Sequence, residues 1–159
     1  MRQLFKFVLF FPVISCLLLF SISGFTQTNP GAAQSDIIQW HEWSNETFAL
    51  AEQQNKLVLL DISAQWCQFC QKMKAVTYKD PEVIDIINDN YIAINADIET
   101  TNDVQMLYGN LGVPGTVVLT ANRDELNKRR GYIPPQQMQW HLLGSLQDLA
   151  TENNPGQSH

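Results

Sequence analysis

The sequence has few cysteines and no clustered metal ligands. Its 159 residues include three cysteines and three histidines, whereas a structural zinc site needs four ligands at short, regular spacing. Apart from Cys67 and Cys70, the candidate ligands are scattered along the chain: Cys16, His41, His141 and His159. Half a zinc site is therefore disfavoured. A purely structural disulfide remains an alternative, although small secreted domains that depend on disulfides usually carry several.

Positive charge is also scarce. The chain has 10 basic and 16 acidic residues, and two of the basic ones, Arg2 and Lys6, lie in an N-terminal segment that we expect to be removed. The remainder has a formal charge of −8, from 8 basic and 16 acidic side chains. Nucleic acid is therefore excluded as an expected partner. The sequence has no nicotinamide or flavin motif, so we expect no cofactor.

Long hydrophobic runs are absent except at the N-terminus. Arg2 and Lys6 precede an apolar stretch at residues 7–20, which small and polar residues follow. A basic start followed by an apolar segment is typical of a secretory signal peptide. We therefore predict a signal peptide at residues 1–26 and export to the periplasm.

Two alternatives exist for this segment. The apolar stretch is long for a signal peptide and could remain as an N-terminal membrane anchor. Residues 13–16 also resemble a bacterial lipobox, which would make Cys16 a lipidated residue. Because residues 17–20 continue the apolar run, we rank cleavage first, the anchor second and lipidation third. Residues 27–36, with a Pro-Gly step, predict a flexible spacer.

The most informative stretch is residues 66–70, Trp-Cys-Gln-Phe-Cys. The apolar, branched run at residues 57–62 predicts a core strand before it, and residues 71–76 predict a helix after it. Cys67 would then lie at a helix N-terminus, where free N–H groups and the helix dipole stabilise a thiolate. Cys70 lies one turn further on, where it can attack a mixed disulfide formed on Cys67. We expect Cys67 to be the exposed nucleophile and Cys70 the shielded resolving thiol.

Asp61 is an acid within this apolar strand, six residues before Cys67. A buried carboxylate without a partner is costly, and burial raises its pKa. We expect Asp61 to lie behind the cysteines and to exchange protons with Cys70. The alternative is a solvent-facing acid at the end of the strand.

A proline turn precedes a later strand. Pro114 lies within residues 112–116, Gly-Val-Pro-Gly-Thr, directly before the β-branched run at residues 116–120. Proline is tolerated at the first residue of a strand, and a cis X-Pro bond is compatible with such a turn.

These features resemble the thioredoxin superfamily. The Trp-Cys-x-x-Cys motif, the acid six residues before it and the proline turn are all in register. Residues 77–83 and 95–97 are most similar to the C-terminal periplasmic thioredoxin-like domain of the disulfide interchange protein DsbD. The resemblance extends over residues 40–149.

The resemblance implies roles for individual residues. Cys67 attacks, Cys70 resolves, Asp61 moves protons, and a cis Pro114 shapes the substrate groove. Five residues are expected to contact the substrate: Trp66, Gln68, Phe69, Val113 and Pro114. The sequence departs from the family at residue 115, where Gly replaces the usual Thr, and we expect a looser groove backbone there. Gln71 also follows the second cysteine, where Lys is frequent.

The remaining pattern predicts an α/β thioredoxin-like fold, with a mixed central β-sheet flanked by helices on both faces. Expected helices cover residues 45–54, the segment after Cys67, the segment from Pro81, residues 100–111 and residues 135–150. Expected strands cover residues 57–62, 91–98, 116–120 and the charged segment 125–132. The last helix is expected to face the core with five apolar residues: Met138, Leu142, Leu143, Leu146 and Leu149. We expect one domain at residues 37–150 and a disordered tail at residues 151–159.

The sequence predicts thiol-disulfide exchange in the reducing direction. Gln68 and Phe69 place no positive charge between the cysteines, and a buried Asp61 disfavours a nearby thiolate, so the thiolate gains little stabilisation. The expected function is a periplasmic protein-disulfide reductase, a monomer that receives electrons from a membrane thiol transporter of the DsbD type. The alternatives are a disulfide oxidase or isomerase, and a non-catalytic thioredoxin-fold binding module.

Overall fold

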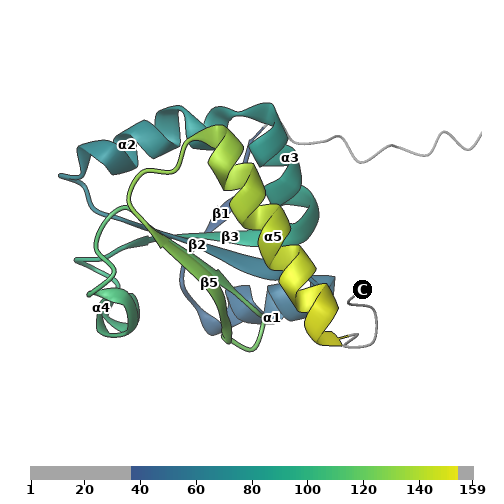
Figure 1. Cartoon of the computed structure of the whole chain (residues 1–159). Helices are drawn as coiled ribbons and strands as arrows, with labels where there is room; N and C mark the ends of the chain where they lie inside the picture. Colours follow the sequence, from purple (N-terminus) through teal and green to yellow (C-terminus); the bar gives the residue numbers. More distant parts are fainter. Residues whose placement is uncertain (1–36, 154–159) are drawn as a thin grey trace, which may run out of the picture. The chain divides into compact units, whose positions relative to one another are not determined.

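The computed structural model of the chain describes residues 37–153, which form a five-stranded β-sheet with helices on both faces (Figure 1). This confirms the expected α/β architecture. The elements in chain order are β1 (Trp40–His41), α1 (Asn45–Gln54), β2 (Leu57–Ser63), α2 (Gln68–Ala75), the 3₁₀ helix η1 (Thr77–Lys79), α3 (Pro81–Asn90), β3 (Tyr91–Asp97), α4 (Asn102–Tyr108), β4 (Gly115–Leu119), β5 (Glu125–Arg130) and α5 (Pro135–Asn153). The predicted signal peptide (1–26) with Cys16, the spacer (27–36) and residues 154–159 of the tail lie outside the described residues.

Capping side chains start helices α1 and α3. Ser44 Oγ accepts a hydrogen bond from the Thr47 backbone N–H at 3.2 Å, at the start of α1. Asp80 Oδ1 accepts one from the Val83 backbone N–H at 3.1 Å, at the start of α3, where Pro81 occupies the first turn. Each cap satisfies a backbone donor that a helix N-terminus otherwise leaves free. Local sequence thus fixes where these helices begin.

The strand order is β1-β3-β2-β4-β5. The central strand β2 pairs in parallel with β3 and antiparallel with β4. In this register Asp61 lies opposite Asn95 on β3 and opposite Thr116 on β4. Directly paired residues of neighbouring strands point to the same face of a sheet. Three polar residues therefore form a row across the centre of the sheet.

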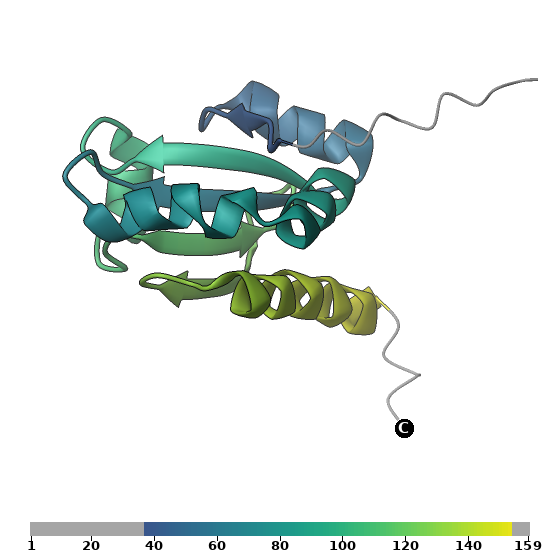
Figure 2. The same ribbon diagram turned by 90° about the horizontal axis from the view of Figure 1, so that it is seen from above.

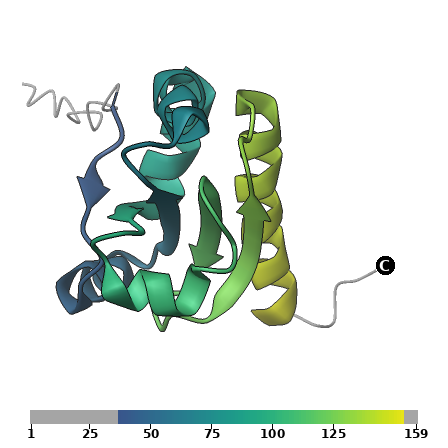
Figure 3. The same ribbon diagram turned by 90° about the vertical axis from the view of Figure 1, so that its left-hand side faces the viewer.

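The two faces of the sheet carry separate hydrophobic clusters. Leu57 and Leu59 of β2 join the cluster that includes Met73 of α2, whereas the intervening residues of β2 join the cluster that includes Phe48 of α1 and Val104 of α4. Figures 1 and 3 show α2, α3 and α5 on one side of the sheet and α1 and α4 on the other. From above, α2 and α3 follow one another across the sheet, with α5 alongside (Figure 2). Since side chains alternate along a strand, Asp61 points to the face that α2 covers.

The buried face of α5 differs from the prediction at one residue. Met138 and Leu142 are fully buried, and Leu146 and Leu149 pack partly against the same cluster. The prediction for Leu143 is wrong, because its side chain is 44% exposed. Successive residues in a helix are about 100° apart, so Leu143 turns away from the face that contains Leu142. Two polar residues, His141 and Ser145, are buried on the core-facing side of α5 together with Met138 and Leu142.

Helix boundaries differ from the expected ones in two places. Helix α4 is shorter than residues 100–111; it buries Val104 and leaves Met106 and Leu107 exposed. Helix α5 continues to Asn153, past the expected domain end at residue 150. Among the helices of residues 37–153, none has the length and apolar composition needed to span a bilayer.

Candidate functional site

Cys67 and Cys70 form a disulfide at the N-terminus of α2. Their Cα atoms are 5.2 Å apart, within the range of unstrained bridges. Cys67 is the N-cap of the helix, and its Sγ accepts a hydrogen bond from the Cys70 backbone N–H at 3.1 Å. In the reduced protein the same N–H and the helix dipole would stabilise a thiolate at Cys67.

The two cysteines are equally buried in the oxidised state. Cys67 is 5% exposed and Cys70 is 3% exposed, so the expected contrast between an exposed and a shielded sulfur is not observed. Both pack with Ala64 and against the partly buried side chains of Ile98 and Val113. The sulfurs therefore differ in their position on the helix rather than in their exposure.

Exposed apolar side chains flank the disulfide. Trp66 is 66% exposed and Phe69 is 61% exposed, and Gln68 between the cysteines is exposed as well. Val113 packs against the cysteines, and Pro114, joined to it by a cis peptide bond, is buried. Of the five residues expected to contact the substrate, Val113 thus lies against the cysteine pair, while Trp66 and Phe69 extend an apolar surface beside it.

Gly115 is tightly packed, in contrast to the looser backbone expected there. It is buried and pairs with Ile62 on β2 and with Arg130 on β5. A Cβ atom at this position would lie 2.9 Å from the Gly112 backbone oxygen and 3.1 Å from the Leu111 side chain. The preceding turn approaches so closely that residue 115 has no room for a side chain.

Asp61 is buried, with 2% of its surface exposed, as predicted from its apolar surroundings. The Tyr78 hydroxyl donates to its Oδ1 at 3.1 Å, and the Asn95 amide donates to its Oδ2 at 2.7 Å. Burial raises the pKa of Asp61 to about 6, opposed by the Tyr78 hydrogen bond, the Lys74 charge and the Asn95 hydrogen bond. A carboxyl group with a pKa near neutrality can both accept and release protons under physiological conditions.

Tyr78 and Asn95 were not predicted as part of the site. Tyr78 follows α2 in η1, and burial together with the Asp61 charge holds its pKa well above the ordinary range, so it remains a donor. Asn95 lies 34 residues after Asp61 and meets it only because β2 and β3 pair in this register. Asn95 lies in a predicted strand and in one of the segments that carry the family resemblance, residues 95–97, but neither signal identifies Asp61 as its partner.

His141, which the sequence offers only as a scattered candidate metal ligand, is a second buried titratable residue. It is 3% exposed, and neither ring nitrogen has a hydrogen-bond partner within residues 37–153. Burial, with a contribution from the nearby Arg129 charge, lowers the pKa of His141 to about 4. The protein therefore stabilises the neutral imidazole.

The free energy of unfolding should change with pH as Asp61 and His141 titrate, and the two groups should act with opposite signs. The pKa of His141 is about 4 in the folded protein, against 6.5 for an unperturbed histidine, so its contribution to the free energy of unfolding is lost as the pH falls through this interval. The pKa of Asp61 is about 6 in the folded protein, against 3.8 for an unperturbed aspartate, so its contribution to the free energy of unfolding is lost as the pH rises through this interval. Each change amounts to about 3 kcal/mol in total. Between pH 4 and 6 the two should nearly cancel.

Single variants should reveal each contribution. In urea unfolding between pH 4 and 6, Asp61→Asn should make the free energy of unfolding rise with pH, by about 1 kcal/mol per pH unit relative to the wild type. His141→Leu should make it fall by a similar amount. If both variants keep the wild-type slope, neither group titrates as described.

No cluster of three or more His, Cys, Asp or Glu side chains that could hold a metal ion occurs among residues 37–153.

Comparison with known proteins gives matches to both sequence and fold. The family model Thioredox_DsbH, described as a protein of unknown function, DUF255, matches residues 30–152. An uncharacterized protein of Caenorhabditis elegans is 31% identical over 106 residues, which make up 62% of this chain and 14% of that protein. The thiol:disulfide interchange protein DsbD of Neisseria meningitidis is 29% identical over 97 residues, or 58% of this chain and 16% of DsbD. The chain thus spans less than a fifth of the length of these relatives.

Solved structures support the same fold. A thioredoxin from Thermus thermophilus superposes with a TM-score of 0.65 at 20% sequence identity, covering 77% of this chain and 97% of that one. This likeness confirms the thioredoxin-like fold expected from the sequence.

Proposed function

We propose that this chain, which belongs to the Thioredox_DsbH family and is similar in sequence to the thiol:disulfide interchange protein DsbD, is a periplasmic protein-disulfide reductase. A single observation carries the proposal: the Cys67 sulfur caps α2 and accepts the Cys70 backbone N–H, with Cys70 one turn away at disulfide distance. A dithiol at a helix N-terminus can attack a substrate disulfide and resolve the product without any cofactor.

The reaction transfers two electrons from the dithiol to the substrate. The Cys67 thiolate attacks a substrate disulfide, forming a mixed disulfide and releasing one substrate thiolate. Cys70 loses its proton and attacks the Cys67 sulfur, which releases the second substrate thiolate and leaves the Cys67–Cys70 disulfide. Asp61, on the face of the sheet that α2 covers, accepts the Cys70 proton.

The reducing direction is supported by the charges around the cysteines. Gln68 and Phe69 between them are uncharged, and the nearby Lys72 ammonium lies over the Tyr132 ring, 4.5 Å from its centroid. Apart from the helix N-terminus, the Cys67 thiolate thus gains little stabilisation. A weakly stabilised thiolate gives a lower reduction potential, which favours a reductant.

The proposal extends to partners and location. Substrates are protein disulfides, which dock on the apolar surface formed by Trp66, Phe69 and Val113, with Gln68 and Pro114 beside it. A membrane thiol transporter of the DsbD type supplies the electrons, in keeping with the similarity to DsbD. The N-terminal residues 1–26 direct the chain to the periplasm, and the domain at residues 37–150 acts there as a monomer.

Turnover with insulin tests the function. The reduced protein, regenerated by dithiothreitol, should accelerate the precipitation of the insulin B chain well above the rate with dithiothreitol alone. A binding module that uses the same surface without redox chemistry would give no acceleration.

A further inference from the structure

Asn95 connects the buried Asp61 to a charged side chain at the protein surface, Lys74. Asn95 donates to Asp61 Oδ2 at 2.7 Å, and the amide oxygen of the same Asn95 accepts a hydrogen bond from the Lys74 ammonium at 3.4 Å. The Asn95 amide nitrogen also donates a hydrogen bond to Ser63 Oγ at 3.3 Å. Its amide is therefore polarised between a cation and a carboxyl group, with its donor end at the acid and its acceptor end at the ammonium.

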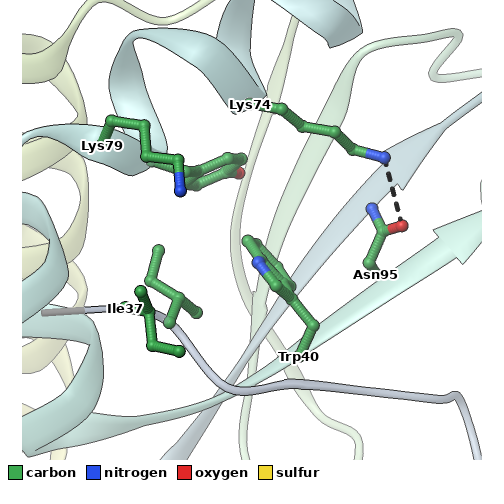
Figure 4. A pocket seen from close by; sticks show the side chains of 7 residues that line it. Ile37, Trp40, Lys74, Lys79 and Asn95 are labelled. Atoms are coloured by element: carbon green, nitrogen blue, oxygen red, sulfur yellow. Dashed lines mark hydrogen bonds between the residues drawn. The ribbon is translucent and has the colours of Figure 1, made fainter. Parts of the chain in front are cut away.

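Lys74 and Asn95 line a pocket that opens to solvent. The pocket has a volume of about 430 Å³, and its walls include Lys74, Tyr78 and Asn95 together with Trp40 and Lys79. Figure 4 shows the hydrogen bond from Lys74 to Asn95, while Lys79 lies apart from them, on the side of Ile37. Tyr78 and Asn95, which both donate hydrogen bonds to the Asp61 carboxyl group, thus form part of the wall of a cavity that water can enter.

The groups that face Asp61 come from four elements. Tyr78 from η1 and Asn95 from β3 donate to it. Thr116 from β4 is its cross-strand neighbour and is uncharged. Lys74 from α2 is the cation whose charge acts on the carboxyl group. A positive charge favours the ionised form of a nearby acid, so Lys74 opposes the effect of burial.

We propose that Lys74 and Asn95 are positioning residues for disulfide exchange, which keep Asp61 ionised so that it accepts the Cys70 proton and passes it to water in the adjoining pocket. This inference rests on the proposed function and specifies its regulation by pH. Asp61 must be ionised to take the proton, so the exchange rate rises with pH through the titration of Asp61. Loss of the Lys74 charge shifts that rise to higher pH.

The matched pair of lysines provides the test. Lys74→Gln removes the positive charge beside Asn95, whereas Lys74→Arg retains a positive charge there. Lys79→Gln removes an equal charge from the same pocket, where the Lys79 ammonium makes no hydrogen bond within residues 37–153. Two readouts apply: the carboxyl carbon shift of Asp61 by NMR in the oxidised protein, and the pH dependence of insulin reduction.

Lys74→Gln should raise the titration midpoint of Asp61, and the acid limb of the rate profile, by about half a pH unit or more. Asn95→Ala should act in the same direction. Lys74→Arg and Lys79→Gln should match the wild type. The proposal is overturned if Lys74→Gln and Asn95→Ala leave both midpoints unchanged, or if Lys79→Gln shifts them equally.

The NMR readout separates this inference from the proposed function, because it requires no turnover. Wild-type turnover with unshifted midpoints in the variants would overturn the inference alone. A wild type without disulfide exchange would overturn the proposed function and, with it, the catalytic part of the inference.

Discussion

Replacing Cys67 with serine is expected to abolish insulin reduction, because a serine hydroxyl cannot form a disulfide with the substrate. Cys67 caps α2 through its sulfur, and serine is itself a good N-cap, so the fold should be preserved. Cys70→Ser should also stop turnover, but at a later step. Its Cys67 can still attack, and without a resolving thiol the mixed disulfide with the substrate accumulates.

Non-reducing gels distinguish the two variants. Cys70→Ser should show substrate adducts that dithiothreitol removes, and Cys67→Ser should show none. Limited alkylation of the reduced wild type should accordingly mark Cys67 first. Adducts that form on Cys67→Ser instead, or preferential labelling of Cys70, would reverse the assignment of attacking and resolving thiols.

Asp61→Asn is expected to slow disulfide exchange at pH 7 by about 100-fold, the lower end of what a positioned general base contributes. Asparagine has nearly the same size as aspartate and can still accept a hydrogen bond from Tyr78 or Asn95, but it cannot take a proton. The rise in rate around pH 6, where Asp61 titrates, should disappear from the profile of the variant.

A matched acid provides the control. Asp97 lies at the end of β3 and accepts a hydrogen bond from the Glu99 backbone N–H at 2.8 Å, in an exposed setting. Asp97→Asn should leave both the rate and its pH profile unchanged. If Asp61→Asn exchanges at the wild-type rate throughout, Asp61 has no role in the proton transfer.

Local patterns were enough to predict the order and type of most elements. The run at residues 57–62, the Asp80-Pro81 step and the alternation after Tyr91 each carry their own signal and needed no tertiary information. The two-residue strand β1 (Trp40–His41) was missed, because so short a segment shows no periodicity and becomes a strand only by pairing with β3.

The environment of Asp61 could be predicted only in part. Its burial follows from the apolar residues around it, but its partners depend on the register of β2 against β3 and on the path of the chain after α2. The segments 77–83 and 95–97, which carry the family resemblance, contain Tyr78 and Asn95, but the local sequence shows neither the strand register nor the path of the chain. The error at Leu143 has a related cause: an apolar residue was assigned to the core by its type, whereas the helical angle places His141 there.

The reduction potential of the Cys67–Cys70 pair distinguishes a disulfide reductase from an oxidase. Equilibration with glutathione buffers of known ratio, with the oxidised fraction measured by thiol labelling, gives this value. We expect a potential nearer that of thioredoxin, about −270 mV, than that of DsbA, about −120 mV. A potential near the DsbA value would identify an oxidant, and would contradict the argument that Gln68, Phe69 and Asp61 give the Cys67 thiolate little stabilisation beyond the helix N-terminus.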